Sequence, residues 1–271
     1  MLNICLCYNY DGDIMLIEKI EKLKNNKYNI YINGEKITTY DNVIIGNNIL
    51  YKKQIDNELY QKILNETEYY SIYNKVVNYI LKKRRSEKEI IQYLNKLNLT
   101  LKEADKMINK LKDINLINDR EYCRAYINDK VYLSNFGINK IKNELINQDI
   151  SLHIIEEELD KIDKTIFYTR LEKILTKKIK SNKKYSSSYL KQKVLNDLLK
   201  LGYEKNAIIE MINKYSIEDS SVLEYEFNKL CTKLINKYDG ENLNKKIEQK
   251  LLMKGFNIHE IKKLIQKKPE K

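Results

Sequence analysis

Two groups of side chains in this 271-residue sequence have chemistry suited to charged ligands. The first is acidic: Glu156, Glu157 and Glu158 are followed by Asp160 and Asp163. Carboxylates so close together are able to hold a divalent ion for nuclease chemistry, or to form one solvated face of a helix. A run of this kind is more often a solvated face, so we favour that interpretation and keep the nuclease as an alternative.

The second group is basic and surrounds two tyrosines, Tyr185 and Tyr189. Lysine ammonium groups bind phosphates, and tyrosine rings offer faces on which bases stack. We therefore predict a surface here that binds nucleic acid or a filament, together with the basic run that ends at Arg84 and Arg85. The predicted lysines of this surface are Lys177, Lys178, Lys180, Lys183, Lys184, Lys191 and Lys193.

The net charge of +12 is spread unevenly along the chain. Residues 164–216 carry 13 Lys and Arg against 4 Asp and Glu, whereas residues 119–163 carry 6 against 10 and residues 67–118 carry 11 against 6. Two simpler interpretations stay open. Cations at the C-terminus of a helix interact favourably with its macrodipole, and this applies to the run ending at Arg85. Lysine enrichment also follows from an AT-rich genome. Neither produces neighbouring segments of opposite sign, so we favour a polyanion-facing surface.

Other reaction chemistries find no support in the sequence. It contains no phosphate-binding loop, nucleophile elbow, H-E-x-x-H motif or glycine-rich dinucleotide turn. The four cysteines form no C-x-x-C pair, and a zinc site that used the two histidines would need ligands from distant segments. We predict no metal, no cofactor and no enzymatic activity, and we interpret Cys123 and Cys231 as small core residues.

An internal repeat indicates which elements position these side chains. Turn centres at Asn98, Asp149, Gly202 and Gly255 follow one another at intervals of 51, 53 and 53 residues. A leucine lies four positions before each centre, an apolar residue one position after it, and further apolar residues six and ten positions after it. Spacings of four place these residues on one helix face, and Asn, Asp and Gly tolerate the left-handed conformation that ends a helix. Each repeat therefore contains a helix, a turn and a second helix.

A period of about 52 residues leaves room for a third helix in each repeat, since the common helical solenoids repeat at shorter intervals. Apolar residues at spacings of three and four precede every predicted pair. The sequence therefore predicts a mainly α fold of about four tandem three-helix repeats in an extended curved array. The predicted repeats span residues 67–118, 119–163, 164–216 and 217–271.

The N-terminal part has a different period and predicts a small strand-rich unit with a helix, residues 15–66. Residues 28–32 and 35–39 flank Asn33-Gly34, the strongest short signal for a type I′ hairpin. We predict further strands at 16–20 and 43–45 and a helix over 55–65. Residues 1–14 form an extension that is either disordered or lies before a natural start at Met15.

The sequence shows no signal that would place part of this chain in a membrane. There is no run of about 18 apolar residues, and the N-terminus lacks the basic-then-apolar order of a signal peptide. The only proline, Pro269, lies where it interrupts no predicted helix. We expect a cytoplasmic protein.

Three segments resemble those of a known protein family: residues 84–90 (RRSEKEI), 117–127 (INDREYCRAYI) and 137–145 (GINKIKNEL). Their order and spacing closely resemble the RecX family of recombination regulators. The resemblance begins at about Met15 and continues through the later repeats, which match by pattern more than by identity. It therefore covers most of the chain.

This resemblance implies a helical regulator that binds the RecA recombinase, chiefly as its filament on single-stranded DNA. Such a regulator limits filament growth or favours disassembly, and thereby restrains ATP hydrolysis, strand exchange and the coprotease activity of the SOS response. The expected partners are RecA and its filament on single-stranded DNA, and DNA itself is a possible direct partner. We expect the regulator to be a monomer. The alternative is a sequence-tolerant helical repeat protein that binds single-stranded nucleic acid without a recombinase.

Overall fold

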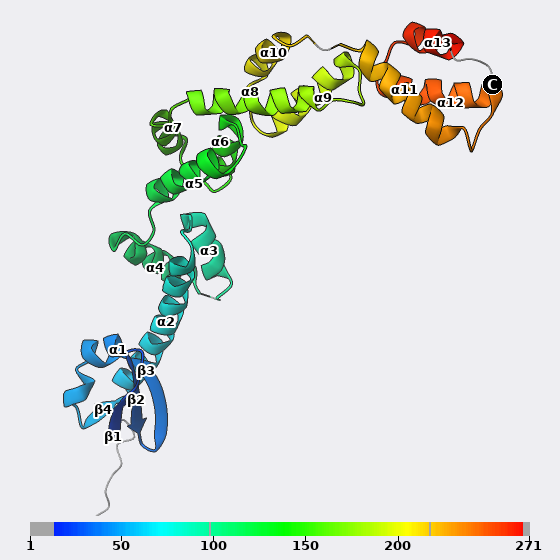
Figure 1. The fold of residues 1–271 in the computed structure, drawn as a ribbon. Coiled ribbons are helices and arrows are strands. Elements are labelled where there is room, and N and C mark those ends of the chain that lie inside the picture. Colours follow the sequence, from blue (N-terminus) through cyan, green and yellow to red (C-terminus); the bar gives the residue numbers. More distant parts are fainter. Residues whose placement is uncertain (1–13, 98, 217, 268–271) are drawn as a thin grey trace, which may run out of the picture. The chain divides into compact units, whose positions relative to one another are not determined.

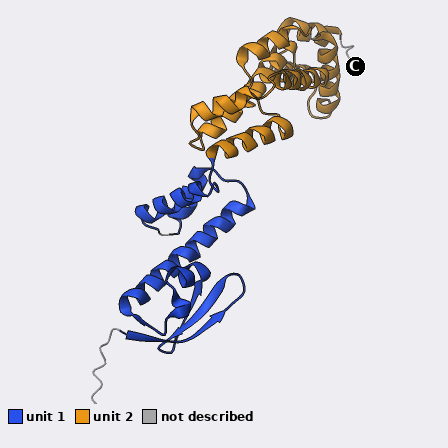
Figure 2. Ribbon diagram, turned by 90° about the vertical axis from the view of Figure 1, so that its left-hand side faces the viewer, with its two compact units in different colours: residues 1–118 blue, residues 119–271 orange. Residues whose placement is uncertain are grey.

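The structure, a computed structural model, describes residues 14–97, 99–216 and 218–267. Helices make up most of these residues, and a small antiparallel sheet lies near the start of the chain (Figure 1). The chain divides into two compact units, residues 1–118 and residues 119–271 (Figure 2). Our expectations for residues 1–13, for the turn at Asn98 and for Pro269 concern positions outside the described residues.

The sheet of the first unit has the order β3-β2-β1-β4, with antiparallel pairing throughout. The predicted hairpin is confirmed: Asn33 and Gly34 both have positive φ, 48° and 82°, as a type I′ turn requires. Ile30 and Ile32 of β2 face a core that also takes in Ile63. The strands are β1 (Ile14–Lys22), β2 (Lys27–Ile32), β3 (Glu35–Tyr40) and β4 (Gln54–Asp56).

The prediction of a strand at residues 43–45 is wrong, because these residues lie in the short helix α1 (Asp41–Gly46). A run of three apolar residues fits either structure, and here Val43 and Ile44 are buried from one face of a helical turn. A 3-10 turn, η1 (Ile49–Tyr51), leads into β4. The predicted helix at 55–65 and the first helix of repeat 1 are one continuous helix, α2 (Asn57–Lys82), so the boundary we placed after residue 66 falls inside it.

Two further helices complete the first unit, and a capping box starts each of them. Ser86 accepts from the backbone of Glu89 at the start of α3 (Glu87–Asn95). Thr100 does the same with Glu103 at the start of α4 (Leu101–Asp113). Ile90, Leu94 and their neighbours on α2 and α4 form the apolar core of this helical part.

The second unit contains nine helices among its described residues, and they follow one another as three groups of three. Cys123 is buried in its core as predicted, where burial raises the pKa of its thiol to about 11, and Cys231 is half-buried beside a second core. The helices are α5 (Asp119–Leu133), α6 (Ile138–Ile146), α7 (Leu152–Asp160), α8 (Thr165–Lys180), α9 (Ser187–Lys200), α10 (Lys205–Asn213), α11 (Ser220–Leu234), α12 (Gly240–Leu252) and α13 (Ile258–Lys267).

The middle helix of each group ends in a left-handed turn, at Asp149, Gly202 and Gly255, with φ of 60°, 85° and 86°. Each turn is a Schellman motif. After α9, for example, Tyr203 N donates to Leu198 O at 3.1 Å and Gly202 N donates to Leu199 O at 2.9 Å. This motif explains the repeat seen in the sequence, because the leucine four positions before the centre and the apolar residue after it are the pair that closes the turn.

The same turns join consecutive helix groups within the second unit. Gly137 N, at the start of α6, donates to Leu201 O at 2.6 Å, and Asn139 N donates to Gly202 O at 3.1 Å. One group later, Ser186 N at the start of α9 donates to Lys254 O at 3.1 Å. The turn after one middle helix therefore lies against the first turn of the preceding middle helix. None of the helices in the described ranges is long and apolar enough to cross a membrane.

Candidate nucleic-acid interface

The loop between α8 and α9 carries two predicted lysines, Lys183 and Lys184, and the side chain of Asn182 orders it. Asn182 Oδ1 accepts from the backbone N of Lys184 at 3.2 Å and of Tyr185 at 3.1 Å, while its Nδ2 donates to Tyr185 O at 2.7 Å. Ser186 then caps α9 by accepting from Tyr189 N. The position of both tyrosines is thus set by short-range hydrogen bonds.

Tyr185 and Tyr189 stack on each other, with ring centroids 4.9 Å apart and an interplanar angle of 17°. Lys193 Nζ lies 4.4 Å from the centroid of the Tyr185 ring and 3.3 Å from its hydroxyl, and Lys184 Nζ lies 5.2 Å from the centroid. Hydrogen bonds from Lys193 and Lys184 lower the pKa of Tyr185. The structure therefore brings two of the predicted lysines together around one predicted ring.

A groove of about 450 Å³ opens beside these rings, and helices α11 and α12 form its other side. Within the described residues, its lysines Lys184, Lys229, Lys233 and Lys250 are exposed and form no ion pair. We call it the basic groove. Its lining residues are Lys184, Tyr185, Tyr189, Glu226, Lys229, Leu230, Lys233, Lys250, Met253 and Lys254.

A buried ion pair between Glu226 and Lys254 lies in the wall of the basic groove. The side chain of Glu226 is 4 % exposed and that of Lys254 is 15 % exposed. Lys254 also provides the backbone carbonyl that accepts from Ser186. This pair neutralises one lysine and fixes α11 to the end of α12, while the four exposed lysines keep their charge available for an anionic ligand.

The other predicted lysines lie outside the basic groove. Lys178 forms an ion pair with Asp197 of α9 at 2.6 Å, so its charge is already matched. Lys180 and Lys183 are exposed, Lys191 is half-buried on α9, and Lys177 lines a different groove. The lysines that the sequence groups together therefore spread over several faces.

Arg84 and Arg85 belong to the first unit, whereas the lysines belong to the second. Arg84 is exposed. The Arg85 guanidinium stacks on the ring of Tyr79, 4.1 Å from its centroid, and its Nη1 pairs with Glu89 at 3.0 Å. Its side chain is only 19 % exposed, so Arg85 helps to hold the end of α2 against the start of α3.

Sequence reasoning missed Lys229, Lys233, Lys250 and Lys254. Residues 217–271 carry 12 lysines against 9 acidic residues, so a count of charge per repeat hides them. The spacing of four between Lys229 and Lys233 places them on one helix face and was a usable signal. Their closeness to Tyr185 was not, because it depends on the contact between Ser186 and Lys254, which are far apart in the chain.

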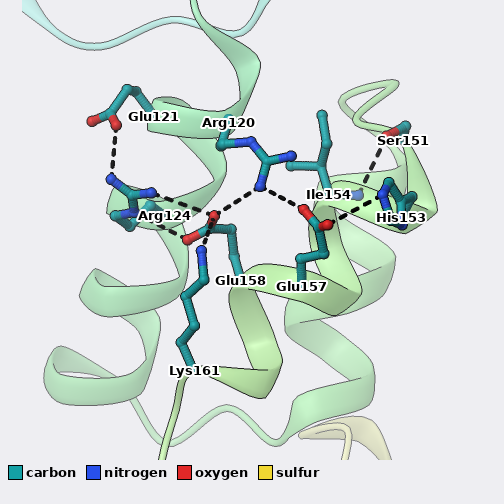
Figure 3. Close-up of polar contacts among 9 residues, drawn as sticks. All are labelled: Arg120, Glu121, Arg124, Ser151, His153, Ile154, Glu157, Glu158 and Lys161. Carbon is teal, nitrogen blue, oxygen red and sulfur yellow. Dashed lines mark hydrogen bonds and ion pairs between the residues drawn. The ribbon is translucent and has the colours of Figure 1, made fainter.

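The acidic run of the sequence forms ion pairs and hydrogen bonds, and Figure 3 shows those of Glu157 and Glu158. Glu158 is buried against α5, where Arg124 Nε lies 3.0 Å from its Oε2, and Arg120 and Lys161 reach its Oε1 at 3.2 Å and 2.6 Å. The interpretation as a solvated face is wrong for Glu158, whose side chain is 1 % exposed. Hydrogen bonds from Arg124, Lys161 and Arg120 lower its pKa to about 2.

The other four carboxylates of the run also have partners. Glu156 pairs with Lys142, Glu157 with Arg120, and Asp160 with Lys164, while Asp163 accepts from Thr165. Within the described ranges, no three His, Cys, Asp or Glu side chains are placed to hold a metal ion. The run thus serves to join α5, α6 and α7.

These features are those of a mainly helical protein with a small N-terminal sheet and a basic, tyrosine-lined groove. No protein-family model matches the chain. The curated regulatory protein RecX of Streptococcus agalactiae serotype III (strain NEM316) is 30 % identical over 263 residues, 92 % of this chain and 97 % of that protein. That of Bacillus cytotoxicus is 28 % identical over 267 residues, 94 % of this chain and 98 % of that protein.

Solved structures agree with this relationship. A crystal structure of regulatory protein RecX has a TM-score of 0.63 at 21 % identity, covering 74 % of this chain and all of its own, which shows the fold. RecX from Lactobacillus salivarius has a TM-score of 0.50 at 25 % identity, covering 54 % of this chain and 96 % of its own. The chain belongs to the RecX family of regulatory proteins, and both the resemblance and the mainly helical fold are confirmed.

Proposed function

We propose that this regulatory protein controls homologous recombination by binding the RecA recombinase as its filament on single-stranded DNA. The observation that carries the proposal is the basic groove, which is lined by four exposed lysines and by a stacked pair of tyrosines. Membership of the RecX family supports the regulatory role. In this proposal the protein is a cytoplasmic monomer.

The chemistry of the basic groove suits a DNA strand whose sequence is not read. Lysine is a flexible point charge that meets phosphates without the planar fork by which arginine reads guanine. Tyrosine rings stack on any base, because every base has a π face. A filament regulator has to act wherever the recombinase assembles, so contacts that tolerate every sequence are what its role requires.

Binding, not catalysis, is the proposed mode of action. The protein limits filament growth or favours its disassembly, and so lowers ATP hydrolysis, strand exchange and SOS coprotease activity. Every carboxylate of the acidic run already has a cation or hydroxyl partner, which argues against the nuclease alternative. For the helical part of the chain we also propose repeat boundaries at residues 118, 163 and 216, whereas the boundary expected at residue 66 lies within α2.

The experiment compares Lys229→Glu/Lys233→Glu with the wild-type protein and with a control, Lys205→Glu, which changes an exposed lysine of α10 outside the basic groove. Fluorescence anisotropy measures binding to labelled single-stranded DNA, with and without RecA and a non-hydrolysed ATP analogue. We expect the double variant to lose affinity for the filament by at least about tenfold, and the control to retain it. Equal affinity of all three proteins would contradict the assignment of this groove.

The alternative function, direct binding of single-stranded nucleic acid, is favoured by the same groove and is tested by the same experiment. Tight binding to bare DNA, with no gain when RecA coats it, would support the alternative. Weak binding to bare DNA and strong binding to the filament would support the recombinase as the partner.

A further inference from the structure

A second groove, distinct from the basic groove, opens between the end of α5 and the face of α8. It has a volume of about 710 Å³. Its apolar side chains are Tyr132, Leu133, Ile166 and Ile174, and its cations are Arg170, Lys173 and Lys177. None of its lining residues is acidic, among the residues that the structure describes. We call it the apolar groove.

Leu133 and Tyr132 are unusually exposed for apolar side chains, at 82 % and 65 %. They lie in the last turn of α5, which is held by hydrogen bonds. Ser134 Oγ donates to Lys130 O at 2.6 Å and accepts from Phe136 N at 3.1 Å. An apolar side chain on a turn fixed in this way does not fold back onto the core, so it stays in water until another surface covers it.

Arg170 ties this turn to α8. Its guanidinium donates to Val131 O and, at 3.2 Å, to Phe136 O, which are carbonyls on either side of the exposed pair. The end of α5, which forms the wall of the groove, and α8, which forms its floor, are therefore joined by hydrogen bonds before any partner binds. A preformed surface of this kind loses little conformational entropy on binding.

The floor follows one face of α8. Ile166, Arg170, Lys173, Ile174 and Lys177 recur at helical spacing, so they line up along a stripe. From Ile166 to Lys177 this stripe extends about 16 Å, or about three helical turns. Its apolar residues alternate with cations, and Lys173 and Lys177, like the groove as a whole, are exposed to solvent.

We propose that the apolar groove binds a short acidic amphipathic helix of a protein partner. Leucine, isoleucine and tyrosine would cover the apolar side of such a helix, while Lys173 and Lys177 would pair with its Asp and Glu side chains. Nucleic acid is the less suitable occupant, because three of the four apolar side chains, Leu133, Ile166 and Ile174, are aliphatic and offer no flat face on which a base can stack, which leaves Tyr132 as the only ring among the lining residues described. The inference goes beyond the proposed function and does not depend on the identity of the recombinase.

A display library of random peptides of about 12 residues, which span about 18 Å as helices, tests this inference. The library is selected on the full-length protein after depletion on Leu133→Ser. We expect the enriched peptides to be acidic and to carry apolar residues at positions i, i+3 or i+4, and i+7. Enriched peptides that are basic or without this period, or no enrichment over the depleted library, would overturn the proposal.

Affinities of an enriched synthetic peptide then locate the site. We expect Leu133→Ser and Lys173→Glu each to weaken binding at least about tenfold. The matched controls are Leu101→Ser, which replaces a leucine that is 81 % exposed on α4, and Lys200→Glu on α9, and both are expected to bind as the wild type does. Circular dichroism checks that each variant is folded. Unchanged peptide affinity in Leu133→Ser, or a loss of single-stranded DNA binding in that variant with peptide binding retained, would refute the assignment.

Discussion

A Cβ atom on Gly202 would lie 2.4 Å from the Cβ of Lys140, so the turn after α9 lies directly against the start of α6. The same close approach occurs once more in the second unit, where a Cβ on Gly255 would lie 2.6 Å from the Cβ of Tyr189. These contacts hold neighbouring helix groups together, and the second one forms part of the basic groove. Glycine is required at both places for two reasons: its positive φ and the lack of space.

The first prediction concerns Gly202→Ala. Alanine there has to adopt a positive φ and also displaces Lys140, so we expect a loss of about 3 kcal/mol in the free energy of unfolding of the second unit. Gly34→Ala is the matched control, since Gly34 has a φ of 82° but no atom within 4 Å of an added Cβ. It is expected to cost only about 1 kcal/mol. Urea unfolding followed by circular dichroism measures both, and equal losses would contradict the role of the contact.

The second prediction concerns pH and Glu158. Its pKa is about 2 in the folded protein and 4.5 for the free group, so the ionised form is favoured by folding. The stability that it contributes is therefore complete above pH 4.5 and is lost as the pH falls from 4.5 towards 2. Glu158→Gln removes this dependence and, at neutral pH, is expected to cost about 1–3 kcal/mol, because three cations lose the negative charge and one of its two acceptor oxygens.

Urea unfolding at a series of pH values tests this prediction. Glu156→Gln is the control, because Glu156 is exposed and pairs only with Lys142 among the described residues. Its loss of stability is expected to be below about 1 kcal/mol. A wild-type stability that stays constant between pH 4.5 and 2 would show that Glu158 is not held ionised by Arg124, Lys161 and Arg120.

The third prediction separates two lysines that look alike in the sequence. Lys184 lines the basic groove, whereas Lys178 is paired with Asp197. Lys184→Ala is expected to weaken binding to single-stranded DNA or its filament and to lower the slope of log affinity against log salt concentration by about 1. Lys178→Ala is expected to leave this slope unchanged and to cost less than about 1 kcal/mol of stability. A salt titration of binding by both variants decides between them.

The fourth prediction concerns base stacking on Tyr189. Tyr189→Leu keeps the Cβ that contacts the turn at Gly255 but removes the ring, so we expect affinity for single-stranded DNA to fall by about 1–3 kcal/mol. Tyr51→Leu, which changes a tyrosine that is 87 % exposed in the first unit, is the control. If both variants bind alike, the tyrosines of the basic groove do not stack on bases.

Local rules predicted much of the fold. Asn33-Gly34 gave the hairpin, and the leucine and apolar residue around Asp149, Gly202 and Gly255 gave the helix ends, because Schellman and type I′ turns depend on residues close together in the chain. Residues 43–45 were assigned wrongly because a short apolar run fits a strand or a helix. The continuity of α2 was missed because we placed a boundary where the sequence period changes, although no Gly or Pro interrupts the helix at residue 66.

The candidate site was predicted less well, for a related reason. Tyr185, Tyr189 and Lys184 are neighbours in the sequence and stay neighbours in the structure. The partners that complete the basic groove come from α11 and α12, and only the contact between Ser186 and Lys254 brings them near. Conversely, the sequence shows Lys178 and Arg85 as cations but does not show their partners. Lys178 pairs with Asp197, and Arg85 pairs with Glu89, so both charges are already matched.

The most direct test of the central claim is the ATPase rate of RecA on single-stranded DNA as this protein is added, with the Lys229→Glu/Lys233→Glu variant titrated in parallel. We predict that the wild-type protein inhibits at amounts well below one per RecA protomer, and that the variant needs much higher amounts. An ATPase rate unchanged by the wild-type protein, together with tight binding to bare DNA, would contradict regulation of the filament.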